Sequence, residues 1–166
     1  MKTVVIDVRV LGFGEKPCRI LSACSVDSGL VSVLKEGKWT LDDVLPKNKD
    51  NTVVVTDATE IIPNWHLSFN AKDQLEDVIN LYQLRSRAKL IKIDPVITKY
   101  SPDNVLQVRK IDKNGLQQEF DSSMLNNGHV AILLSVWAGF RIAQTNSMND
   151  KDEPNVVDSS MMPFSI

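Results

Sequence analysis

The strongest constraint on the fold is the opening run of the chain, which reads MKTVVIDVRVLG. Side chains of an extended strand alternate between two faces, so Val4 and Ile6 lie on one face, and Val5 and Asp7 on the other. Both faces then carry mostly β-branched residues, the pattern of a central strand that is covered on both sides. Asp7 places a carboxylate inside this apolar run, and a buried charge requires a partner.

The composition is that of a soluble globular protein. The chain has 166 residues, of which 43% are hydrophobic and 24% are charged, with a formal net charge of -2. Such a chain can bury its own core, and its charge balance predicts no overall nucleic-acid or membrane-binding surface. The longest apolar run, 130–140, is shorter than the ~20 residues that span a bilayer. We therefore expect a cytoplasmic protein without a membrane partner, located in the host cytoplasm or the virion if the source is viral.

The first third of the chain predicts an antiparallel meander. Turn residues separate the opening strand from a second strand over 18–26 and a third over 30–34. Cys18 and Cys24 would lie in one strand about 20 Å apart. A disulfide needs Cα atoms within about 7 Å, so both cysteines are expected to be free, buried thiols.

The middle of the chain predicts a strand, a helix and a strand. A short helix starts at Thr40 and ends before Pro46, and the β-branched run 52–56 is typical of a buried, parallel strand. Residues 71–88 have the periodicity of an amphipathic helix capped by Asn70. Another strand follows over 90–100, which completes a right-handed crossover unit.

The last part predicts a hairpin, a buried helix and a tail. Extended runs at 105–111 and 116–120 flank an Asn-Gly turn, and residues 128–142 are apolar nearly all round. The fold class is thus mixed α/β, in the order strand-strand-strand-helix-strand-helix-strand, then a hairpin and a buried helix. We expect one domain over 1–145 and an acidic, polar tail over 146–166.

Carboxylates at two strands suggest a metal site. Asp7 lies in the first strand, and Asp57 and Glu60 follow the fourth. If these strands are neighbours, the acids can converge on Mg²⁺ or Mn²⁺, and two such ions would support phosphodiester hydrolysis. The alternative is that Asp7 satisfies a backbone group and that Asp57 and Glu60 are loop or cap residues.

These residues resemble those of the RNase H-like superfamily, and within it the RuvC-type Holliday-junction resolvases. That family carries an Asp in the first strand followed by a Gly-aromatic-Gly stretch, matched by Asp7 and by 12–14, and an acid after the fourth strand, matched by Asp57 or Glu60. Its last helix opens with an acid or a His, matched by His129. The resemblance covers residues 1 to about 142. It implies that these side chains are catalytic and that Asp7, Asp57 and Glu60 hold the metal ions.

The chain also departs from the family's pattern. Ile132 stands where the last helix carries its required Asp, and the glycine that directly follows the first Asp is absent. The resemblance therefore implies either a metal-dependent or a degenerate junction nuclease.

Basic residues suggest a surface for DNA. Arg85 and Arg87 end the amphipathic helix, and Arg109 and Lys110 lie in the hairpin. Guanidinium and ammonium groups in such positions contact phosphates, although cations at a helix end also favour the helix dipole without any ligand. The histidines and cysteines lack the spacing of a zinc site.

Two other functions are open. A non-enzymatic interaction or assembly protein, of viral origin for example, would use the tail 146–166 to contact a protein partner or a second copy of the chain. A single-stranded-DNA-binding module is the other, because the tail resembles the acidic, Pro-Phe-ended tails of bacterial proteins of that class. The helix over 71–88 argues against the simple barrel that such modules use.

Overall fold

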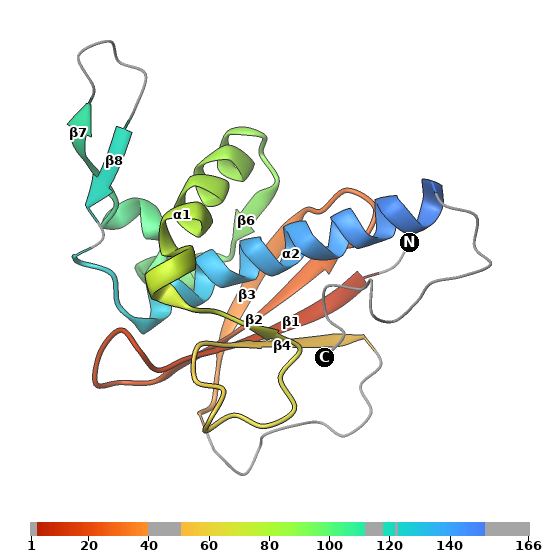
Figure 1. The fold of residues 1–166 in the computed structure, drawn as a ribbon, viewed down its shortest axis with the longest axis horizontal. Helices are drawn as coiled ribbons and strands as arrows, with labels where there is room; N and C mark the ends of the chain where they lie inside the picture. The colour runs from red at the N-terminus through yellow and green to blue at the C-terminus, as the bar shows by residue number, and fades with distance from the viewer. Residues whose placement is uncertain (1–2, 40–50, 112–117, 122, 152–166) are drawn as a thin grey trace.

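A mixed six-stranded sheet forms the centre of the molecule. The computed structural model describes residues 3–39, 51–111, 118–121 and 123–151, and of these it gives the backbone alone at 107–111, 118–121 and 147–151. The strand order is β5-β4-β1-β2-β3-β6, and β7 and β8 form a separate two-stranded sheet. Helix α2 lies across one face of the large sheet, and α1 packs beside α2 (Figure 1).

Strand β1 (Thr3–Val10) is central, as predicted. It pairs antiparallel with β2 (Cys18–Ser25) and parallel with β4 (Thr52–Thr56). Strand β3 (Val31–Gly37) continues the predicted meander beside β2. The core residues of β1 are buried on the side of α2, and Asp7 and Arg9 are buried on the opposite side. Both cysteines are free and buried, which confirms that prediction.

The segment after β4 confirms the helix and corrects the strand that follows it. The short strand β5 (Leu67–Ser68), absent from the sequence prediction, extends the sheet beside β4. Helix α1 (Ala71–Arg87) begins at Asn70, whose side chain accepts a hydrogen bond from the Lys72 amide. The predicted strand 90–100 is only β6 (Ile91–Ile93), because Asp94 caps a 3₁₀ helix, η1 (Pro95–Tyr100), which begins with a proline.

The connection from β4 to β6 crosses the sheet. Strand β6 pairs parallel with β3 at the edge opposite β5, so β4 and β6 are separated by three strands. The strand–helix–strand unit is present, and its two strands are parallel without being neighbours. A second 3₁₀ turn, η2 (Pro102–Asn104), leads to the hairpin of β7 (Gln107–Ile111) and β8 (Gln118–Asp121), which is as predicted. The Asn-Gly turn and the predicted helix at Thr40 lie outside the described residues.

Helix α2 (Asn127–Lys151) is the longest element and extends beyond the predicted 128–142. Residues 146–151 of the predicted tail are therefore helical, and the remainder lies outside the described part. Gly139 allows α2 to approach the sheet closely, since a Cβ there would lie 2.2 Å from Cγ2 of Val31 and 3.3 Å from Sγ of Cys24. In keeping with this close packing, residues 129–139 of the helix are all buried.

The described elements confirm the mixed α/β fold class, and the first helix of the predicted order lies outside them. An antiparallel meander, a fourth strand parallel to the first and a late buried helix are all present. Within the described residues, no helix is both long enough and apolar enough to cross a membrane.

Candidate functional site

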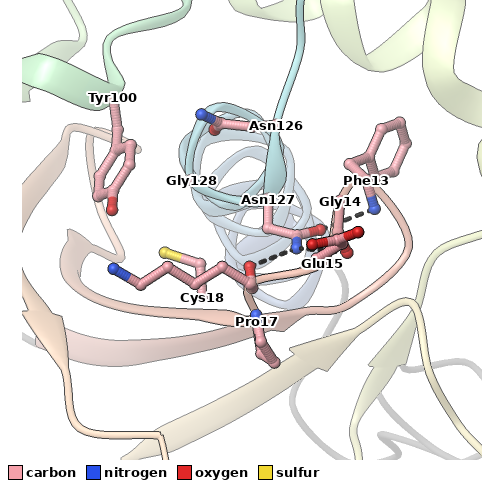
Figure 2. Close-up of a pocket in the computed structure, with 10 residues that line it drawn as sticks. Phe13, Gly14, Glu15, Pro17, Cys18, Tyr100, Asn126, Asn127 and Gly128 are labelled. Atoms are coloured by element: carbon pink, nitrogen blue, oxygen red, sulfur yellow. Dashed lines mark hydrogen bonds between the residues drawn. The ribbon is translucent and has the colours of Figure 1, made fainter.

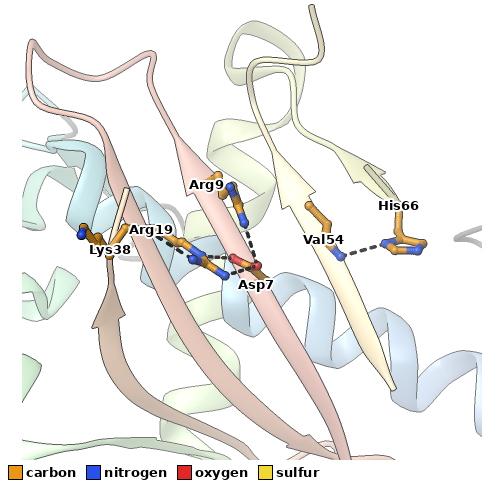
Figure 3. A network of polar contacts seen from close by, with 6 residues as sticks. All are labelled: Asp7, Arg9, Arg19, Lys38, Val54 and His66. Atoms are coloured by element: carbon orange, nitrogen blue, oxygen red, sulfur yellow. Dashed lines mark hydrogen bonds and ion pairs between the residues drawn. The ribbon is translucent and has the colours of Figure 1, made fainter. Parts of the chain in front are cut away.

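The Asp7 carboxylate is neutralised by two arginines. The Arg19 guanidinium on β2 donates from Nε to Oδ1 and from Nη2 to Oδ2, both at 2.9 Å. Arg9 on the same strand as Asp7 donates from Nη2 to Oδ2 at 3.3 Å (Figure 3). The Asp7 side chain is 1% exposed and that of Arg19 10%. The partner that the buried Asp7 carboxylate needs is therefore the Arg19 guanidinium, which binds it in a bidentate contact.

Arg19 also connects this pair to the next strand. Its Nη1 donates to the backbone carbonyl of Lys38 at 3.3 Å. Its side chain passes close to Gly37 at the end of β3, where a Cβ would lie 3.0 Å from Cδ of Arg19. The network thus joins β1, β2 and β3 on the face of the sheet opposite α2.

Asp57 holds the end of β1 to the end of β4. Its carboxylate accepts hydrogen bonds from the amides of Leu11 at 2.9 Å and Gly12 at 2.8 Å. The contact is close enough that a Cβ on Gly12 would lie 2.6 Å from Oδ2 of Asp57. Glu60 is exposed in the loop after β4, where Thr59 donates to its carboxylate at 3.4 Å. Asp57 is thus a loop-fastening residue, in agreement with the alternative given for it.

The expected convergence of Asp7, Asp57 and Glu60 is not found. Within the described residues, no group of three or more His, Cys, Asp or Glu side chains is placed to hold a metal ion. Asp7 does not fit a divalent cation, because both its oxygens already bind a guanidinium. Strands β1 and β4 are neighbours, which is the condition for convergence, but Asp7 lies midway along β1 whereas Asp57 and Glu60 follow the end of β4. A catalytic role for any one of them stays a prediction.

His129 forms a capping arrangement at the start of α2. The Asn126 side chain accepts the His129 amide at 3.0 Å, and Nδ1 of His129 accepts the Asn126 amide at 3.1 Å. This reciprocal pair is a capping box in which a histidine takes the place of the usual Glu or Gln. The His129 ring also lies edge-on to Tyr100, with centroids 6.4 Å apart. Its acceptor nitrogen is therefore committed to the backbone.

Asn127 fastens the β1–β2 loop to α2. Its Oδ1 accepts the Phe13 amide at 2.7 Å, and its Nδ2 donates to the carbonyls of Lys16 at 2.6 Å and Gly14 at 3.5 Å. Asn127 is 2% exposed. The loop is thus fixed at its start by Asp57 and along its length by Asn127.

Beside this loop lies a pocket of about 330 Å³. It is bounded by the loop, by Tyr100 at the end of η1 and by the first turn of α2 (Figure 2). Cys18 lies in its wall, where burial and the Glu36 carboxylate raise the pKa of the thiol to about 12. The thiol is therefore protonated at neutral pH and is a poor nucleophile.

The basic residues predicted to bind nucleic acid lie in two places, at the end of α1 and on β7. The Arg85 guanidinium packs over the Phe140 ring, 5.3 Å from its centroid, so it belongs to the contact between α1 and α2. Arg87 is exposed at the end of α1. Arg109 and Lys110 lie on β7, where the register shifts between Val108 and Lys110. Nucleic-acid binding by these residues stays a prediction.

The environments of His66 and His129 predict that the free energy of unfolding decreases in acid. Nδ1 of His66 accepts the Val54 amide at 2.9 Å, as Nδ1 of His129 accepts that of Asn126. Burial lowers the pKa of both rings from the ordinary 6.5. The unfolded chain then binds more protons than the native one, so the stability contributed is complete above pH ~6.5 and decreases as the pH falls below it.

Urea unfolding at a series of pH values between about 8 and 5 measures this effect. The variants His66→Asn and His129→Asn keep an acceptor near the position of Nδ1 and cannot be protonated. We expect each to reduce the decrease in unfolding free energy between pH 6.5 and 5. An unchanged pH dependence in both variants would contradict the assignment.

Sequence reasoning missed the residues that organise this region. Arg9 and Arg19 were not linked to Asp7, although the register of an antiparallel pair places position 19 opposite position 9, beside Asp7. The partner of a buried carboxylate commonly lies on a facing strand, and Arg19 in the second predicted strand was such a signal. Asn127 gave no local signal, because its partners lie more than a hundred residues earlier in the chain.

Comparison with known proteins found a solved structure that is similar to this chain. No family model matches the chain, and no curated protein matches it. The large terminase nuclease from thermophilic phage G20c superimposes with a TM-score of 0.48 and 13% sequence identity, over 80% of this chain and 81% of the terminase chain. An overlap of this extent assigns neither a family nor an activity to the chain.

Proposed function

We propose that this chain is a degenerate relative of the junction nucleases: a protein of RNase H-like order that binds nucleic acid without cleaving it. The observation that carries the proposal is the pairing of Asp7 with the guanidinium of Arg19, which takes both carboxylate oxygens. The acid that would be expected to bind metal instead joins two strands of the sheet.

Electrostatics supports this view of Asp7. A divalent cation placed at Asp7 would face Arg19 and Arg9 at contact distance, and like charges repel strongly where water is excluded. Asp57 directs its two oxygens at two backbone amides, which fixes the loop. Ile132, buried inside α2, offers no ligand where the resolvase pattern has its last acid.

The nucleic-acid part of the proposal is supported by charge and by the order of the elements. Arg109 and Lys110 are adjacent on β7, in a hairpin that projects from the main sheet (Figure 1). A basic strand on a projecting hairpin can reach a phosphate backbone that the body of the protein does not contact. By analogy, the RNase H-like order also favours a nucleic-acid partner.

Binding and cleavage of labelled four-way-junction, duplex and single-stranded DNA test the proposal. We expect binding that weakens with salt, and no cleavage with Mg²⁺ or Mn²⁺. The double variant Arg109→Ala/Lys110→Ala should reduce the slope of log K against log[salt] by about 2, one unit for each phosphate that is no longer neutralised. Lys72→Ala, which removes an exposed cation from the start of α1, is the matched control.

Two outcomes would overturn the proposal. Mn²⁺-dependent cleavage that Asp7→Asn abolishes would show that Asp7 is a catalytic metal ligand. The absence of any salt-sensitive DNA binding would remove the nucleic-acid partner and favour the assembly protein, for which deletion of 152–166 and a measurement of self-association are the test.

A further inference from the structure

The two faces of the large sheet differ in how well they are covered. On β2, Ser22 faces α2 and is completely buried, whereas Leu21 and Ala23 on either side of it are half-buried. Val5, the partner of Ala23 on β1, is 39% exposed, and Leu34 on β3 is 43% exposed. We call the surface formed by these four apolar side chains the open face. Apolar side chains that gather on one surface and stay exposed there mark a site of interaction.

A β-bulge adds to the open face and gives it a basic border. A register shift in the pairing of β2 with β3 leaves Leu34 and Lys35 together opposite Leu21. Lys92 on β6 lies on the same side, because it is paired with Ser32 of β3. In the described strands of the large sheet, Lys35 and Lys92 carry the exposed charges on this side. We call these two lysines the basic rim of the open face.

The segment that follows α2 has the complementary character. Residues 152–158 contain Asp152, Glu153 and Asp158, and residues 161–166 read MMPFSI. No lysine or arginine occurs between 152 and 166. An acidic stretch followed by an apolar one matches an apolar surface with a basic rim. A second copy of the open face does not match it, because a symmetric contact would place one basic rim beside the other.

Helix α2 ends at the same end of the sheet as the open face. Ala143 packs at the β2–β3 turn, where a Cβ on Gly29 would lie 3.2 Å from the Cβ of Ala143. From there the helix continues for about 12 Å and runs past the sheet (Figure 1). Residues 152–160 can span about 30 Å when extended. This length allows 161–166 to turn back around the sheet and reach Val5.

We propose that residues 161–166 dock on the open face of the same chain, with the acids of 152–158 beside the basic rim. The short connection to α2 keeps this segment at a high effective concentration, which favours the same chain over a second copy. The face of the sheet that α2 does not cover is then closed by the continuation of α2. This inference does not depend on the proposed function.

Paramagnetic broadening of amide signals in the NMR spectrum of the full chain tests the proposal. A nitroxide is attached at Ser165→Cys. The native thiols are not labelled, because burial raises the pKa of Cys18 to about 12 and that of Cys24 to about 11. We expect strong broadening of the amide signals of the open face, and much weaker broadening at the β1–β2 loop, which lies at the other end of β1.

Substitutions on both sides of the contact show whether docking is specific. Leu34→Asp and Phe164→Asp should each lower the ratio of docked to undocked chain about tenfold, since each would bury a carboxylate against apolar side chains. Phe164→Asp leaves the sheet unchanged, so it decides the test if Leu34→Asp is unstable. The double variant Lys35→Ala/Lys92→Ala should weaken docking and reduce its dependence on salt. Val96→Asp, at a 70% exposed position of η1, is the matched control and should change nothing.

A mixed sample distinguishes the same chain from a second copy. It contains isotope-labelled chain without nitroxide and unlabelled chain with nitroxide, and we expect no broadening in it. Broadening in the mixture would assign the segment to a second copy and overturn the proposal. The proposal is also wrong if the open face shows no broadening, or if Phe164→Asp leaves the broadening unchanged. These samples contain no nucleic acid, so failure here leaves the proposed function undecided.

Discussion

Replacing Arg19 with methionine is expected to lower the free energy of unfolding by about 3–5 kcal/mol. The substitution keeps most of the apolar volume and removes the guanidinium that binds both oxygens of Asp7. It leaves a carboxylate that is 1% exposed with the longer, 3.3 Å contact from Arg9. A buried carboxylate that loses its bidentate partner and keeps one longer contact is poorly compensated, and such a loss is among the large single destabilising effects. Urea unfolding followed by circular dichroism measures the change.

A double-mutant cycle separates the interaction energy of Asp7 and Arg19 from the general effect of losing a cation. Asp7→Asn with Arg19→Met should cost clearly less than the sum of the two single changes, since each change removes the reason for the other. Lys38→Met is the matched control, because Lys38 is an exposed cation whose contact with Arg19 is made by its backbone. If Arg19→Met costs no more than this control, the pair does not organise the sheet.

Replacing Gly139 with valine is expected to lower the free energy of unfolding by about 3 kcal/mol, the upper part of the usual range for overpacking. The new Cβ would lie 2.2 Å from Cγ2 of Val31, so either α2 or β3 must shift. The buried surface of α2 contacts β1 and β2 as well, so this shift affects the centre of the core. Gln144→Val places the same side chain at an exposed position of the helix and should cost only its lower helix propensity.

A second substitution tests whether the clash with Val31 is the cause. Gly139→Ala should destabilise less than Gly139→Val, because alanine adds one methyl group and favours the helix by about 1 kcal/mol. Adding Val31→Ala to Gly139→Val removes Cγ2 of Val31, the atom with which the new side chain would clash. The double variant should therefore be more stable than the sum of the two single changes predicts. Simple additivity would show that the helix is not limited by this contact.

The fold was largely predictable because its signals are local. The β-branched run of β4 and the apolar periodicity of α1 each lie within one element, and the Asn70 cap was found where expected. The prediction of a strand over 90–100 was wrong because Asp94 and Pro95 start a 3₁₀ helix. The alternation of apolar residues in this segment does not distinguish such a helix from a strand. Strand β5 was missed because two residues are too few for a periodicity to be seen.

The site was less predictable because its interactions join distant parts of the chain. The pattern at Asp7 indicated a buried carboxylate and did not indicate whether a metal ion or a guanidinium accompanies it. Either a metal ion or a guanidinium can compensate the carboxylate charge. Which of them does so depends on the side chain that the facing strand presents. Asp57 likewise had the expected place after β4, while its use as an acceptor for two amides depends on where β1 ends.

The sequence by itself therefore determined most of the strands and both long helices, that β1 is central, and that Asp7 needs a partner for its charge. These properties follow from side-chain alternation, propensity and the cost of burying a charge, which act within a few residues. Only the tertiary structure decided that Arg19 supplies the counter-charge, that Asn127 fixes the β1–β2 loop and that a pocket opens beside α2. Each of these depends on contacts between elements that lie far apart in the chain, and no local pattern encodes such distances.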